Sequence, residues 1–135
     1  PDAMTIVALS HAHVVQAAEL VAADVARLRR RVPALPEAWT DPAHVAKVVA
    51  GLADRGTGLV ALDDGIPVAF QAAVLLDGRG GRFAYTPDVG HAAPPDPAGR
   101  VRSRLYAELA DDWIRGACVE HVVTVLADDE VALAT

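Results

Sequence analysis

The chain of 135 residues has the length of one domain, and a domain of this size buries about two thirds of the surface that its unfolded chain exposes. Its hydrophobic fraction of 53% comes mostly from Ala, Val and Leu, so we expect an aliphatic core rather than a disordered chain. The net charge of −6 argues against a broad nucleic-acid surface, because duplex binding depends on neutralising phosphates.

Membrane, disulfide and metal-binding classes are also disfavoured. No apolar run approaches the roughly 18 residues of a membrane span, and the opening PDAMTIVALSHAH lacks the pattern of a signal peptide. We therefore expect a cytoplasmic protein. The single Cys118 excludes an internal disulfide and a cysteine-based zinc site, and its apolar neighbours favour a small buried side chain. No histidine and acid pair has metal-ligand spacing, so no metal is predicted.

The first third of the chain predicts a strand and two helices. Residues 4–9 are strand-like, and Ser10 can cap a helix that ends near Arg31, before Pro33. Its apolar stripe consists of Val14, Ala18, Val21, Val25, Leu28 and Val32. Asp41 followed by Pro42 predicts the start of a second helix, which stops at Gly56. Its expected inward face consists of Val45, Val48, Val49 and Leu52.

The rest of the chain predicts a meander of strands, then a helix and a final strand. Residues 58–62, 66–76 and 82–86 are separated by DDG and DGRGG, which are typical of tight turns. Residues 87–99, PDVGHAAPPDPAG, predict a long loop. Helical periodicity resumes at Val101 and ends at Gly116, residues 119–126 read as a strand, and Asp128 or Asp129 can cap one more short helix.

This order, together with the stretch RVRSRLYAELADDWIRGACVEHVVTVLADDEVALAT, resembles the GNAT superfamily of N-acetyltransferases. The resemblance implies an α/β fold with a mixed, mostly antiparallel sheet flanked by helices, in which residues 119–126 lie parallel to residues 82–86. In the family the sheet opens between these two strands to admit the cofactor. Residues 1–135 would form one GNAT-like domain that lacks the family's last two strands, so we expect either a homodimer or a fragment of a longer polypeptide.

The resemblance implies acetyl-CoA as the cofactor. The two glycine positions of the family's phosphate loop fall on Arg100 and Arg102, or, one residue earlier, on Gly99 and Val101. The implied cofactor-binding positions are Tyr85, Thr86, Gly99, Arg100, Val101, Arg102, Ser103 and Arg104. Arginine adds bulk where a diphosphate approaches the backbone, but it also adds long hydrogen-bond donors. This degenerate loop therefore either binds acetyl-CoA through its arginines or only carries solvated ones.

Two residues after the third strand of the meander are candidates for the catalytic base. His91 can accept a proton from an amine, although it can equally be a histidine that orders the loop. Asp88 is the alternative base, and an aspartate after a proline is also common in turns. The leading hypothesis is an acetyl-CoA-dependent N-acetyltransferase whose acceptor amine, a small molecule or a protein N-terminus or lysine, is unknown. The alternatives are a non-catalytic GNAT-like module that supports a second domain or a dimer, and an unrelated α/β binding protein.

Overall fold

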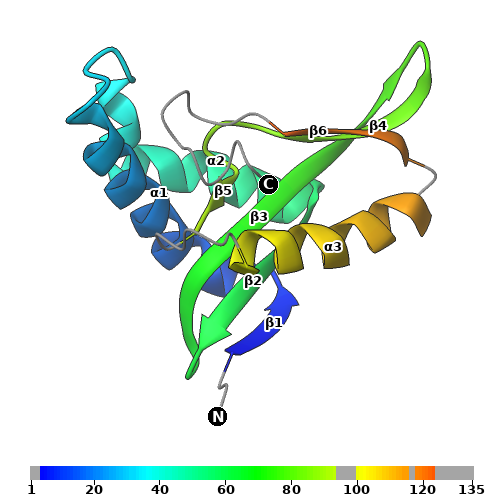
Figure 1. Cartoon of the computed structure of the whole chain (residues 1–135), viewed down its shortest axis with the longest axis horizontal. Helices are drawn as coiled ribbons and strands as arrows, with labels where there is room; N and C mark the ends of the chain where they lie inside the picture. The colour runs from blue at the N-terminus through cyan, green and yellow to red at the C-terminus, as the bar shows by residue number, and fades with distance from the viewer. Residues whose placement is uncertain (1–3, 94–99, 116–117, 124–135) are drawn as a thin grey trace.

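The computed structural model describes residues 4–93, 100–115 and 118–123. Figure 1 shows a twisted sheet with helices on both sides. In chain order the elements are β1 (Met4–Ala8), η1 (His11–His13), α1 (Val14–Arg29), η2 (Glu37–Thr40), α2 (Pro42–Arg55), β2 (Thr57–Asp63), β3 (Ile66–Gly78), β4 (Gly81–Thr86), β5 (His91–Ala92), α3 (Arg100–Arg115) and β6 (Cys118–Val123).

The sheet has the predicted topology. Its strands are ordered β1, β2, β3, β4, β6, and β5 pairs with β3. The pairs β1–β2, β2–β3 and β3–β4 are antiparallel, whereas β6 runs parallel to β4. The predicted meander and the parallel last strand are therefore confirmed. Strand β4 pairs with β6 from Arg82 to Thr86. Strand β5, which follows β4 in the chain, pairs with β3.

The sheet separates two hydrophobic layers, because successive side chains of a strand point to opposite faces. On one face Val60 and Phe70 pack with the buried stripes of α1 and α2. On the other face Ala73 and Ala84 pack with Leu109 of α3. In Figure 1 helix α3 crosses in front of the sheet, and α1 and α2 lie on its opposite side. Each helix of the described ranges is too short or too polar to cross a lipid bilayer.

The first helix is shorter than predicted. It begins with the single 3-10 turn η1, and α1 ends at Arg29 instead of near Arg31. Pro33 disfavours helical geometry at the residue before it. The helix ends in a tight turn, in which the N–H groups of Arg31 and Val32 both donate to the carbonyl of Leu28. Val32, predicted as the end of the inward stripe, therefore lies beyond the helix.

The second helix begins as predicted, with Asp41 accepting a hydrogen bond from the N–H of Ala43 at 3.1 Å and Pro42 as its first residue. Val45, Val49 and Leu52 are buried. Val48 is 38% exposed, so its assignment to the inward face was wrong. The helical period gives the direction of a stripe, but the width of the buried face depends on the neighbours that cover it.

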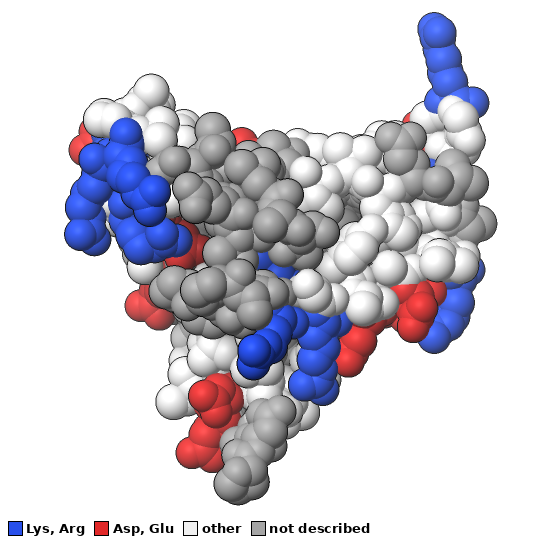
Figure 2. Space-filling view, viewed as in Figure 1, with Lys and Arg blue, Asp and Glu red and all other residues white. Residues whose placement is uncertain are grey.

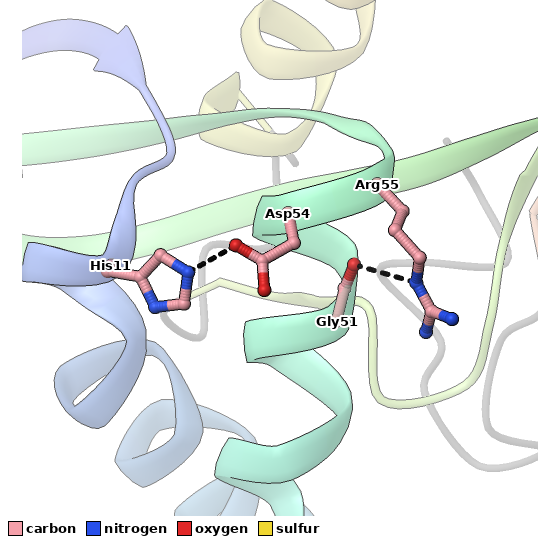
Figure 3. Close-up of polar contacts among 4 residues, drawn as sticks. All are labelled: His11, Gly51, Asp54 and Arg55. Carbon is pink, nitrogen blue, oxygen red and sulfur yellow. Dashed lines mark hydrogen bonds and ion pairs between the residues drawn. The ribbon is translucent and has the colours of Figure 1, made fainter.

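One side-chain contact connects the end of α2 to η1, and another lies within α2 itself. The ring of His11, in η1, points at the carboxylate of Asp54 near the end of α2 and pairs with it, whereas Arg55 reaches back to the carbonyl of Gly51 (Figure 3). The helix then stops at Gly56, where a Cβ would lie 2.0 Å from the carbonyl oxygen of Ala73. Glycine is required there because the backbone of β3 passes so close to it.

The first turn of the meander is also as predicted. Asp64 and Gly65 connect β2 to β3 with positive φ angles of 53° and 82°. Two successive residues with positive φ are typical of a type I′ turn, whose twist suits a two-residue hairpin.

Candidate functional site

The candidate site begins at an interruption between β4 and β5. Both strands pair with β3: Tyr85 lies opposite Val74, and His91 lies opposite Gln71. Five residues separate Tyr85 from His91, but only two separate Val74 from Gln71, so three extra residues are accommodated. We call residues 87–90 the bulge. The loop predicted over residues 87–99 was therefore wrong at His91 and Ala92, which form β5; residues 94–99 lie outside the described residues.

Hydrogen bonds of the backbone hold this bulge. The N–H of Gly90 donates to the carbonyl of Pro87 at 2.9 Å, and the carbonyl of Gly90 accepts from the N–H of Ala72 on β3 at 2.8 Å. Val89 packs into the hydrophobic layer beneath α1 and α2. The bulge is thus fastened at both sides of Asp88, which fixes the direction of this side chain relative to the sheet.

Asp88 carries an unsatisfied oxygen. Its side chain is partly exposed, but its Oδ1 atom is buried and has no hydrogen-bond partner within residues 4–93, 100–115 and 118–123. Most buried polar atoms in proteins are hydrogen-bonded, and an unpaired one needs an explanation, such as a catalytic role or a missing ligand. The geometry therefore leaves one buried carboxylate oxygen at the bulge without a donor among the described residues.

His91 is engaged by helix α3. It is 7% exposed, and its Nδ1 atom lies 2.6 Å from Nη1 of Arg102. A guanidinium has only donors, so Nδ1 is the acceptor in this contact. It carries no proton, and the proton of the neutral ring is on Nε2. In this arrangement neither nitrogen of His91 is free to accept a proton without breaking the contact with Arg102.

Next to His91, two polar side chains on the α3 side of the sheet are buried. Nε2 of Gln71 lies 3.5 Å from Oγ1 of Thr86, and their side chains are 7% and 0% exposed, respectively. The side chain of Thr86 therefore belongs to the interior. Tyr85 points to the opposite face and is partly exposed.

The predicted phosphate-loop residues have different environments. Figure 2 shows basic side chains gathered over the start of α3. Arg100, Ser103 and Arg104 are exposed, and Arg104 pairs with Glu108 one turn later at 3.7 Å. Val101 packs against the apolar layer around Leu105, and Arg102 points to His91. Gly99 lies outside the described residues.

The structure thus brings together His91 and Arg102, with Asp88 three residues before His91, and keeps Arg100, Ser103 and Arg104 on the exposed side of α3. Sequence reasoning missed Gln71, although a lone amide within the apolar run IPVAFQAAVLL was a visible signal. It also missed an aromatic group in which the hydroxyl of Tyr106 bonds to Nδ1 of His121 at 2.8 Å. Within the described ranges no group of three or more His, Cys, Asp or Glu side chains could hold a metal ion.

No protein-family model matches the sequence, and no curated protein matches it. Solved structures do. A ribosomal-protein-alanine N-acetyltransferase from Brucella melitensis biovar Abortus 2308 is 19% identical, with a TM-score of 0.68 over 98% of this chain and 88% of that chain. The chain has the GNAT N-acetyltransferase fold.

Two further structures agree with this GNAT fold. An aminoglycoside acetyltransferase from an uncultured soil metagenomic sample, in complex with sisomicin, is 18% identical, with a TM-score of 0.64 over 98% of this chain and 84% of that chain. The aminoglycoside N-acetyltransferase AAC(6')-Iy, in complex with CoA, is 15% identical, with a TM-score of 0.60 over 99% of this chain and 84% of that chain. At these identities the likeness establishes the GNAT fold.

Proposed function

We propose that this protein transfers an acetyl group from acetyl-CoA to an amine. The observation that carries the proposal is the fold, since nearly the whole chain superposes on acetyltransferases, one of them in complex with CoA. Acetyl-CoA supplies the acetyl group as a thioester, which an amine can attack directly. The residues of this chain bind the cofactor, orient it and remove the proton of the amine.

The start of α3 fits the diphosphate of the cofactor. Free backbone N–H groups at the first turn of a helix bind anions, and the helix dipole adds to the attraction. Arg100 is the first residue of α3 and is exposed, so its guanidinium can reach a phosphate through charge-assisted hydrogen bonds. Arg104 is exposed one turn later and pairs with the surface carboxylate of Glu108, which a phosphate can replace.

The bulge supplies the base. Oδ1 of Asp88 has no partner in the part of the chain that the structure describes, and in our proposal it accepts a hydrogen bond from the incoming amine and then its proton. His91 is less suited to this role because its Nδ1 already accepts from Arg102. Asp88 is therefore our first choice among the two candidate bases. In the same proposal Tyr85 and Thr86, at the end of β4, offer backbone N–H groups next to the bulge that polarise the carbonyl of the thioester.

The test is calorimetric titration of the chain with CoA, followed by a thiol-release assay with acetyl-CoA and a panel of small amines and peptides. We expect binding that weakens with added salt, because exposed ionic contacts are screened. Arg100→Ala should weaken CoA binding by about tenfold, the value of one charge-assisted hydrogen bond. Arg115→Ala is the matched control, since Arg115 is an exposed arginine at the other end of α3.

Two outcomes would contradict the proposal. The first is absence of CoA binding at millimolar concentration, which would favour a non-catalytic module with the GNAT fold. The second is CoA binding that Arg100→Ala and Arg115→Ala weaken equally, because the binding would then follow net charge and not the start of α3.

A further inference from the structure

The contact between His91 and Arg102 joins two elements that the cofactor would meet. His91 belongs to β5, which is only two residues long and is held by its pairing with β3. Arg102 is the third residue of α3. The bond between Nη1 and Nδ1, at 2.6 Å, is charge-assisted and almost excluded from water on the His91 side, so it is stronger than a surface contact.

This bond lies where the apolar packing of α3 is weakest. The buried residues of α3 are Leu105, Leu109 and Trp113, which begin in its second turn. In the first turn Val101 is only partly buried, and Arg100 and Ser103 are exposed. A helix terminus with little apolar burial opens easily, so a polar anchor there has a large influence on its position.

We infer that His91 and Arg102 form a positioning pair that fixes the first turn of α3 against β5, and that neither residue acts directly on substrate or cofactor. Rigid attachment of the turn keeps its backbone N–H groups in place before a diphosphate arrives, which lowers the entropic cost of binding. The cofactor part of this inference rests on the proposed function. The structural part, that the pair holds the turn, does not.

Asparagine and leucine at position 91 make a matched comparison, because their side chains have nearly the same shape. Asparagine keeps an acceptor close to the position of Nδ1, whereas leucine has none. In His91→Leu the partly buried guanidinium of Arg102 loses the acceptor on β5, and the first turn should loosen. In His91→Asn the anchor should be retained.

The first measurement is hydrogen exchange of the amides of residues 104–107 without ligand. These amides are the first to be bonded within the helix, so their exchange reports opening of the first turn. We expect His91→Leu to accelerate it by about tenfold or more and His91→Asn by less than about threefold, following the value of a hydrogen bond to a charged group. Arg104→Ala, which removes only a surface ion pair, should leave it nearly unchanged.

A second comparison tests the pair as a unit. If the two residues act through one another, Arg102→Met should accelerate exchange as His91→Leu does, and the double variant should add little to either. Additive effects in the double variant would overturn the pair. So would equal exchange in His91→Leu and His91→Asn, because the acceptor would then have no role.

The third measurement separates positioning from catalysis. A positioning role predicts that His91→Leu raises the Kd for CoA and the KM for acetyl-CoA by about tenfold, whereas kcat changes less. In His91→Asn both constants should stay near those of the unmodified chain. A base at His91 predicts instead that both variants lose kcat and the acidic limb of the pH profile, with the Kd for CoA unchanged; that result would overturn the inference. If the unmodified chain fails to bind CoA, the proposed function falls, and hydrogen exchange still decides whether the pair holds the turn.

Discussion

Replacing Asp88 by asparagine should make the protein more stable and less active. The Oδ1 atom of Asp88 is buried and finds no hydrogen-bond partner among the described residues, and an unsatisfied buried polar atom costs about 1–3 kcal/mol. The side chain is partly exposed, so we take the lower end of this range. Asparagine keeps the shape and still leaves one polar atom unpaired, but it removes the charge, and a neutral amide costs less to bury than a carboxylate. The free energy of unfolding should therefore rise by about 1 kcal/mol.

For a domain of 135 residues, about 1 kcal/mol corresponds to a rise of about 3–4 °C in Tm. Urea denaturation and thermal unfolding at neutral pH measure this change. Asp111→Asn is the control, because Asp111 is exposed on α3 and its replacement changes net charge by the same amount. Its Tm should change by less than about 2 °C, as expected for a surface substitution.

The same substitution should reduce kcat for acetyl transfer by about a hundredfold or more, because an amide cannot accept the proton of the amine. A gain in stability together with a loss of activity is the sign of a group kept for function at a cost to the fold. The reasoning would be refuted if Asp88→Asn lost more than about 1 kcal/mol of stability, since Asp88 would then be a structural residue. Unchanged kcat in Asp88→Asn would remove Asp88 as the base.

Two stability predictions test how the sheet is packed. Gly56→Ala should lower the free energy of unfolding by about 3 kcal/mol or more in urea denaturation, because its Cβ would lie 2.0 Å from the carbonyl oxygen of Ala73. Gly80→Ala is the control: no described atom lies within 4 Å of its Cβ, so the free energy of unfolding should change by less than about 0.5 kcal/mol. Thr57→Val should cost about 1–3 kcal/mol in the same measurement, because the indole N–H of the buried Trp113 loses the acceptor that it contacts at 2.9 Å. If this hydrogen bond is the cause, Thr57→Val should cost much less when it is made in Trp113→Phe, which has no indole N–H; an equal cost in both backgrounds would contradict the assignment.

The fold could be predicted because its signals are local and agree with one another. The turn at Asp64 and Gly65 lies between two apolar runs, and the cap at Asp41 precedes a proline and a periodic stripe. Each of these patterns fixes one element within a few residues. The order of the elements then leaves few possible topologies, since sequential strands usually pair and a parallel pair needs a crossover helix, which here is α3.

The elements that were missed are specified by residues far away in the sequence. Strand β5 has two residues in a stretch rich in proline and glycine, and these residues lie opposite Phe70 and Gln71 on β3. Nothing within residues 87–99 indicates that pairing. The bulge has the same origin, because it is defined by the difference in length between two strands and not by any pattern in one of them.

The candidate site was predictable in its residues and not in their contacts. Sequence spacing placed Arg100 and Arg104 on one face of the helix and Arg102 on another, which agrees with their exposure. The partner of Arg102 could not be predicted from the spacing, because His91 is separated from it by a stretch without periodicity. Likewise, Asp88 could be named as a candidate, but the burial of a single oxygen depends on how the bulge folds against the sheet.

The contacts at the start of α3 also change how its arginines bear on cofactor binding. From the sequence, two arginines at the family's glycine positions would both obstruct a diphosphate that approaches the backbone. In the structure the guanidinium of Arg102 is bonded to His91, on the side of the helix that faces the sheet, so its bulk is directed away from the exposed side of the first turn. In the proposed binding mode the remaining obstacle is Arg100, whose flexible side chain is exposed and carries the charge that a diphosphate attracts. The departure from the glycine pattern is therefore compatible with anion binding at this helix, because Arg102 contacts a buried histidine and Arg100 has an exposed, flexible side chain at the first turn.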